Sequence, residues 1–134
     1  MARVLFVCRH NSGRSQVGQA LFERAAQGRH EARSAGTQPG PRVHPAAVEA
    51  MREVGIDLSG RVPRPLTDDL AEWADVVVTM GCGDECPSIP GKRYLDWDLP
   101  DLAGRPLAEV RATRDEIGHR VEELVEQLDR PAGA

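Results

Sequence analysis

The chain lacks the features that mark nucleic-acid-binding and membrane-spanning proteins. Its 134 residues carry a net charge of −4, so no excess positive charge is present to attract nucleic acid or an anionic membrane surface. No apolar run approaches the ~20 residues that a membrane span needs. Aromatic residues make up only 4% of the chain, and Lys92 is the sole lysine among seventeen basic residues. We therefore expect one globular domain over residues 1–134, long enough to bury a core.

Targeting signals and paired cysteines are also missing. An apolar segment begins almost directly after the first residue, which predicts that there is no signal peptide and that the protein is cytoplasmic. Only three cysteines are present, Cys8, Cys82 and Cys86, and an odd number does not suit a disulfide framework. In a reducing compartment they would be thiols, so chemistry explains them better than cross-linking. The sequence predicts no cofactor, and we expect a monomer.

Apolar strands alternate with amphipathic helices along the chain. The predicted strands cover residues 3–7, 31–35, 75–80 and 91–95, and the predicted helices cover residues 15–27, 45–54, 67–70 and 107–128. Short, almost continuously apolar strands between helices are typical of a parallel sheet that is covered on both faces. The sequence therefore predicts an α/β fold of three layers, with a four-stranded parallel sheet between helices.

The segment that follows the first predicted strand combines a cysteine, small residues and an arginine. It reads Cys-Arg-His-Asn-Ser-Gly-Arg-Ser over residues 8–15. A loop between a strand and a helix N-terminus can direct successive backbone N–H groups at an oxyanion. Arg14 can bind two oxyanion oxygens, and the positive field favours the nucleophilic thiolate of Cys8. The candidate oxyanion-binding residues are Arg9, His10, Asn11, Ser12, Gly13 and Arg14.

Cys82 and Cys86 follow the most strongly apolar strand. Because the carboxyl ends of parallel strands meet at one edge of a sheet, this segment can approach Cys8. Three interpretations stay open. A zinc site lacks a fourth ligand at a suitable spacing, and the two cysteines can be incidental buried residues. The third interpretation, which we favour, is a relay that passes a disulfide away from Cys8.

Residues 8–15 resemble the loop that low-molecular-weight tyrosine phosphatases share with the arsenate reductases of the same fold. Further segments resemble the arsenate reductase branch in particular. They are Ser-Ala-Gly-Thr at 34–37, Glu-Val-Gly-Ile-Asp-Leu at 53–58, Val-Val-Thr-Met at 77–80, Tyr-Leu-Asp-Trp at 94–97 and Arg-Asp-Glu-Ile at 114–117. The resemblance covers nearly the whole chain. It implies a low-molecular-weight phosphatase-like fold and a thioredoxin-coupled arsenate reductase that acts in arsenic detoxification.

The resemblance also implies a role for each cysteine. Cys8 would attack arsenate, and Cys82 would attack the thiol–arsenate adduct, releasing arsenite. Cys86 would then take over the disulfide, which thioredoxin reduces. Arg14 and the loop amides would hold the oxyanion, and phosphate or sulfate would compete with arsenate for the loop.

Supporting residues follow from the same resemblance. Ser15 would hydrogen-bond the thiolate, and Asn11 would brace the loop. The family's general acid is an aspartate in an Asp-Pro pair soon after the tryptophan. Asp101 matches it by position, although Leu102 replaces the proline, and Asp98 is the alternative. Whichever aspartate acts has to deliver a proton to the leaving oxygen.

A potassium site is a further feature of some members of this family. They bind the ion beside the loop through an asparagine, a glutamate, a serine and an aspartate. Asn11 and Ser34 match, whereas Gln19 stands in the glutamate position and no aspartate match is clear near residues 63–65. The sequence therefore predicts no metal and no strong potassium site.

Other functions remain as alternatives. Reduction through a low-molecular-weight thiol such as mycothiol, with a glutaredoxin-like partner, would need only Cys8. A phosphotyrosine phosphatase typically has tyrosines after the acid, whereas here Leu102 follows it and Tyr94, the one tyrosine, comes earlier. Weak phosphatase activity is still expected, because phosphate and arsenate have nearly the same shape. A sensor without catalytic activity is the last alternative. His10 and His44 are interpreted as loop residues, since a stabilised thiolate needs no base.

Overall fold

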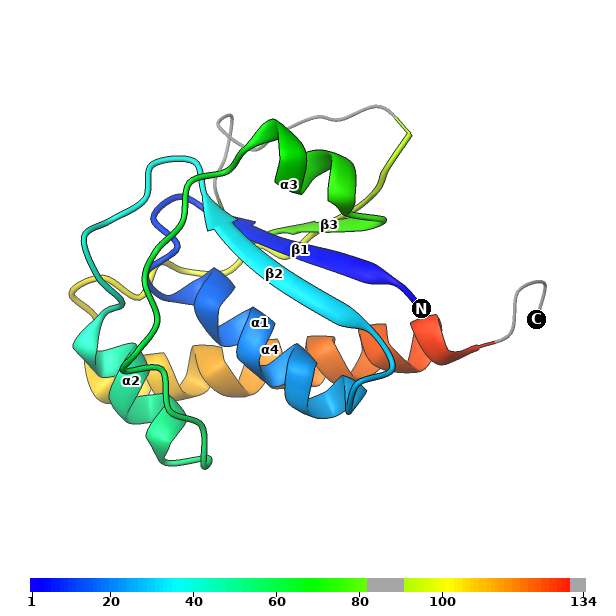
Figure 1. The fold of residues 1–134 in the computed structure, drawn as a ribbon. Coiled ribbons are helices and arrows are strands. Elements are labelled where there is room, and N and C mark those ends of the chain that lie inside the picture. Colours follow the sequence, from blue (N-terminus) through cyan, green and yellow to red (C-terminus); the bar gives the residue numbers. More distant parts are fainter. Residues whose placement is uncertain (82–90, 131–134) are drawn as a thin grey trace.

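A computed structural model describes residues 1–81 and 91–130 and confirms the predicted α/β class (Figure 1). Four parallel strands form one sheet in the order β2-β1-β3-β4. The strands are β1 (Arg3–Cys8), β2 (Glu31–Gly36), β3 (Val76–Thr79) and β4 (Arg93–Asp96). The helices are α1 (Arg14–Ala26), α2 (Pro45–Arg52), α3 (Asp68–Trp73) and α4 (Leu107–Asp129).

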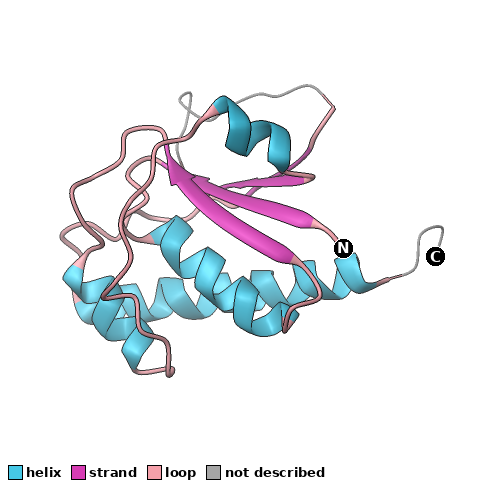
Figure 2. Ribbon diagram, viewed as in Figure 1, coloured by secondary structure: helices cyan, strands magenta, loops and turns pink. Residues whose placement is uncertain are grey.

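The sheet separates two hydrophobic clusters, as alternating side chains of a strand require. Val4 and Phe6 face the larger cluster, which packs against α1, α2 and α4. Leu5 and Val7 face the smaller one, which α3 covers with Leu70 and neighbouring residues. Figure 2 shows the same division, with three helices on one face of the sheet and the short α3 on the other. The three predicted layers are confirmed.

The strand order places the end of β1 in the middle of the sheet, at the edge where the parallel strands end. The chain leaves β1 to form β2 on one side and later adds β3 on the other side. Cys8 pairs with Gly36 of β2, and Val7 pairs with Thr79 of β3. In a parallel sheet, this point of divergence is where a ligand finds a crevice. The topology therefore leaves Cys8 at the position expected for chemistry.

Small differences at element ends have local causes. The last strand begins at Arg93 rather than at Gly91, because Gly91 has a φ of +82° and turns the chain. The helix predicted over residues 67–70 begins at Asp68, because Thr67 is its N-cap: the Thr67 side chain accepts a hydrogen bond from the Leu70 N–H at 3.2 Å. Among the helices in the described ranges, none is long and apolar enough to cross a membrane.

Candidate active site

Cys8 lies at the end of β1 with 2% of its surface exposed. Its Sγ is 2.9 Å from the Ser15 hydroxyl and 3.3 Å from the Asn11 backbone nitrogen, which donates to it. Ser15 belongs to the first turn of α1, so the loop returns the helix start to the sulfur. These contacts fix the position of the sulfur beside the loop, which makes this thiol a candidate nucleophile.

Asn11 holds the middle of the loop in place. It is fully buried and has a φ of +51°, a left-handed conformation that asparagine tolerates better than most residues. Its Nδ2 donates to the Ser15 hydroxyl at 2.6 Å. Its Oδ1 accepts from Gln16 Nε2 at 3.0 Å and from the Arg64 backbone nitrogen at 2.9 Å. The brace expected of Asn11 is therefore present, and the structure adds Gln16 and Arg64 to it.

Arg14 points across the loop toward the segments that follow β3 and β4. Its side chain is 5% exposed, and Nη1 donates to the carbonyl oxygens of Leu99 at 3.2 Å and Gly81 at 3.4 Å. Its Nη2 lies 3.9 Å from Asp101 Oδ2. Two carbonyl contacts fix the direction of the guanidinium, so a positive charge stands at the edge where Cys8 ends its strand.

Asp101 is the aspartate that lies beside this guanidinium, whereas Asp98 is exposed. Partial burial would raise the pKa of Asp101, but the Ala103 N–H bond to Oδ1 and the charge of Arg14 outweigh it and lower the pKa. The next residue, Leu102, is only 2% exposed. A Cβ built at Gly13 would be 3.1 Å from its Cδ1, so Leu102 anchors the segment of Asp101 on the loop.

His44 and His10 also make contacts at the loop. The His44 N–H donates to the Ser12 carbonyl at 2.8 Å, and its ring lies against Gly13. Partial burial lowers the pKa of His44, although the charge of Asp101 acts in the opposite direction. His10 Nδ1 lies 3.0 Å from the Gln38 carbonyl oxygen, which joins the loop to the segment after β2.

Comparison with known proteins agrees with this geometry. A family model described as low molecular weight phosphotyrosine protein phosphatase matches residues 3–133. The chain belongs to this family. It is 39% identical over 129 residues to a putative arsenate reductase of Halobacterium salinarum, and the match covers 92% of this chain and 91% of that protein. It is 36% identical over 131 residues to a glutaredoxin arsenate reductase of Synechocystis, and 96% of this chain and 99% of that protein are covered.

A solved structure gives the same result in three dimensions. A thioredoxin-dependent arsenate reductase of Corynebacterium glutamicum superposes with a TM-score of 0.80 and 42% identity. The match covers 97% of this chain but 63% of that longer chain, so the present sequence corresponds to a part of it. The predicted membership of the phosphatase family is confirmed by these comparisons, and the relatives named above are called arsenate reductases.

Some of the remaining predicted site residues belong to the described loop, and the others lie outside the described residues. Arg9 is exposed, and Ser12 is buried with its hydroxyl donating to the His10 carbonyl at 3.2 Å. Both belong to the loop, as expected. Cys82 and Cys86 lie outside the described residues, so their predicted relay stays a prediction.

Potassium does not fit the residues behind the loop. Asn11 Oδ1 already accepts two hydrogen bonds, and Ser34 donates its hydroxyl hydrogen to Gln19 Oε1 at 2.6 Å. The adjoining cavity of about 380 Å³ is lined by Arg61 and Arg64, and no carboxylate of the described chain lines it. Outside residues 82–90 and 131–134, no cluster of His, Cys, Asp and Glu can hold a metal ion.

Gln16 and Arg64 were not predicted as site residues. Gln16 carried a weak signal, because it is a long polar residue that directly follows the Cys-Arg-His-Asn-Ser-Gly-Arg-Ser segment. Arg64 carried none, since the group that contacts Asn11 is its backbone N–H, which every residue except proline has. The same is true of the carbonyl groups of Leu99 and Gly81 that hold Arg14.

Proposed function

We propose that this protein reduces arsenate to arsenite and that Cys8 is the nucleophile. The observation that carries the proposal is the buried Cys8 sulfur, which receives the Asn11 N–H and contacts the Ser15 hydroxyl. A tethered guanidinium, that of Arg14, stands beside the same loop. The relatives described above are named arsenate reductases, which supports arsenate as the oxyanion.

The first step forms a sulfur–arsenic bond. Arg14 and the loop amides bind the arsenate oxygens, and the Cys8 thiolate attacks arsenic. One arsenic–oxygen bond breaks, and the oxygen leaves as water after it takes a proton from Asp101. In the empty site the pKa of Asp101 is lowered. A bound negative oxyanion offsets the charge of Arg14 and raises that pKa, which favours the protonated acid when it is needed.

The second step transfers two electrons from sulfur to arsenic. The Cys82 thiolate attacks Cys8 Sγ, a sulfur–sulfur bond forms, and the electron pair of the sulfur–arsenic bond stays on arsenic, which leaves as arsenite. The Cys86 thiolate then attacks Cys82, releases Cys8 and leaves a Cys82–Cys86 disulfide. A dithiol of thioredoxin reduces this disulfide. Sequence position and family resemblance support the roles of Cys82 and Cys86.

The test is arsenate turnover coupled to thioredoxin, thioredoxin reductase and NADPH. We expect the unaltered enzyme to turn over many times and the variants Cys8→Ser, Cys82→Ser and Cys86→Ser each to lose multiple turnover. A single-turnover assay separates the roles further. Cys86→Ser should still release one arsenite per enzyme, whereas Cys8→Ser should release none.

The electron donor has an alternative with its own support, because one relative is named a glutaredoxin arsenate reductase. In that mechanism a low-molecular-weight thiol, such as mycothiol, attacks the adduct at Cys8. If the enzyme is inert with thioredoxin but active with the thiol and its glutaredoxin-like partner, and if Cys82→Ser has no effect, the relay is wrong. Arsenate reduction itself would then still stand.

Weak hydrolysis of phosphate esters is a second activity, supported by the family to which the chain belongs. The Cys8 thiolate can attack phosphorus while Arg14 holds the phosphate oxygens, and the ester P–O bond breaks so that the alcohol leaves with a proton from Asp101. Water then hydrolyses the phosphocysteine, which releases phosphate and restores Cys8. Hydrolysis of p-nitrophenyl phosphate by the unaltered enzyme and by Cys8→Ser measures it. If hydrolysis is fast and arsenate reduction is absent with every donor, the protein is a phosphatase rather than a reductase.

A further inference from the structure

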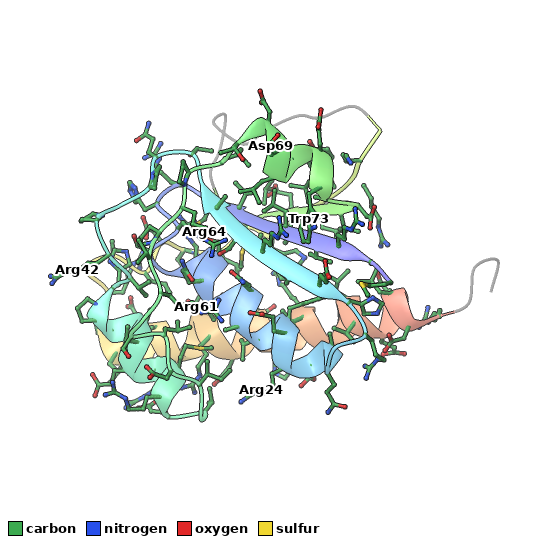
Figure 3. The ribbon with its side chains drawn as sticks, viewed as in Figure 1. Arg24, Arg42, Arg61, Arg64, Asp69 and Trp73 are labelled. Carbon is green, nitrogen blue, oxygen red and sulfur yellow. The ribbon has the colours of Figure 1, made fainter. Side chains whose placement is uncertain are left out.

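The polar cavity that adjoins Asn11 and Ser34, described above, lies directly behind the loop that carries Cys8. It has a volume of about 380 Å³, and its lining includes Gln16, Gln19, Ser34, Arg61 and Arg64, which we call the Arg61–Arg64 pocket. Figure 3 shows both arginines on the segment that runs between α2 and α3, beside α1 and β2. The proposed reaction uses none of the side chains that line this pocket.

The pocket is electropositive. Arg61 and Arg64 are the charged residues in its lining. Arg61 is half-buried and lies 3.2 Å from Glu23, so its charge is partly balanced. Arg64 is exposed, and within the described part of the chain no carboxylate pairs with its guanidinium. Two guanidinium groups at one cavity attract an anion and repel a cation, and their planar N–H groups suit tetrahedral oxyanions.

The inner wall of the pocket contains an incomplete hydrogen-bond set. Gln16 is 2% exposed, and its Oε1 is the one buried side-chain polar atom of the described residues without a hydrogen-bond partner. A buried acceptor without a donor is unfavourable, so such an atom indicates a missing partner. Hydrogenphosphate and hydrogenarsenate carry acceptor oxygens for the arginines and also one O–H, the kind of donor that Oε1 of Gln16, a residue of the pocket lining, lacks.

We propose that the Arg61–Arg64 pocket binds a protonated tetrahedral oxyanion, inorganic phosphate or its arsenate analogue, at a site separate from the loop of Cys8. This inference concerns binding alone, so it does not depend on arsenate reduction. Its occupant would also steady the catalytic loop. Gln16 Nε2 and the Arg64 backbone nitrogen both donate to Asn11 Oδ1, at 3.0 and 2.9 Å, and Asn11 in turn donates to Ser15.

The experiment is a phosphate titration of the isotope-labelled protein, followed by the chemical shifts of its backbone amides. Two groups of amides should respond, those of residues 11–15 in the loop and those of residues 60–62, Arg64 and Ser34 at the pocket. The two groups should saturate at different phosphate concentrations. In Arg61→Gln/Arg64→Gln the loop group should respond as before. The pocket group should need at least about tenfold more phosphate, because two charge-assisted contacts are lost.

Matched controls separate a site from a general charge effect. Arg120→Gln/Arg130→Gln removes the same charge from arginines that pair with glutamates of α4, and it should leave both groups unchanged. The amide spectrum of each variant shows whether it folds, and Arg64→Gln alone serves if the double variant does not. The proposal is overturned if all amides follow one saturation curve in every variant. It is overturned equally if potassium chloride, but not phosphate with a choline counterion, shifts the pocket group.

Discussion

Gly36 ends β2 where the catalytic loop crosses it, and replacing it by alanine should displace that loop. A Cβ on Gly36 would lie 2.7 Å from the Arg9 carbonyl oxygen and 2.9 Å from the Asn11 nitrogen. Both neighbours are backbone atoms, so no side-chain rotation can make room. Gly36 is also fixed from its other side, because its N–H donates to the Arg64 carbonyl at 2.8 Å. The added methyl group must therefore move the loop itself.

The size of the effect follows from the clash. Ordinary contacts lie near 3.5 Å, so the loop has to shift by about 0.5–1 Å. Overpacking of this kind costs about 1–3 kcal/mol of unfolding free energy. At about 3–4 °C per kcal/mol for a domain of this size, Tm should fall by roughly 3–12 °C. Because a misplacement of about 1 Å can cost ~100-fold in rate, the turnover number should fall at least about tenfold.

Gly60→Ala is the matched control for this prediction. A Cβ at Gly60 would meet no atom within 4 Å, and the backbone there needs no positive φ. Its Tm should stay within about 2 °C of the unaltered protein. Calorimetry gives Tm, and the alkylation rate of Cys8 by iodoacetamide reports loop geometry without reference to any substrate. If Gly36→Ala matches Gly60→Ala in both measurements, contact with β2 does not set the position of the loop.

Three further substitutions test other contacts. The pKa of Glu53 is about 2, because arginine side chains of α4 donate hydrogen bonds to its carboxylate. A carboxyl pKa that is lowered in the folded state adds to the free energy of unfolding. That contribution is complete above pH ~4.5 and is lost as the pH falls toward ~2. Tm measured across that range should therefore fall more steeply in the unaltered protein than in Glu53→Gln, while Glu109→Gln should match the unaltered protein. Ser15→Ala should slow alkylation of Cys8 at neutral pH by about tenfold or more, since the hydrogen bond that joins the Ser15 hydroxyl to the sulfur is lost. An unchanged rate would contradict the contact. Leu102→Ala should lower the unfolding free energy by about 2–5 kcal/mol in denaturant titrations, because a buried side chain leaves a cavity, and a loss under 1 kcal/mol would show that the loop does not depend on it.

The fold was predictable because its signals are local. Continuous apolar runs marked β1 and β3. The loop of Cys8 was equally predictable, since Cys8, Asn11, Arg14 and Ser15 lie within eight successive residues and their chemistry depends on side-chain type. The strand order was not predictable in this way, because no short sequence segment indicates which strands pair with β1.

The supports of the loop were not predictable, for a physical reason. Arg14 is held by the Leu99 and Gly81 carbonyl groups, and Asn11 is held in part by the backbone of Arg64. These contacts span 85, 67 and 53 residues of sequence. A backbone donor or acceptor has no sequence signature, so only the folded chain shows which one arrives at the site.

Contacts of the loop also connect Cys8, the proposed nucleophile, to Asp101, the proposed acid. In the position where the family has a proline after the acid, Leu102 holds the segment by packing on Gly13 rather than by a restricted backbone. The segment is held a second time through the bond from Arg14 to the Leu99 carbonyl. Both anchors belong to the catalytic loop, so a shift of the loop moves Asp101 along with Cys8. Loop substitutions should therefore change nucleophilic attack and proton delivery together.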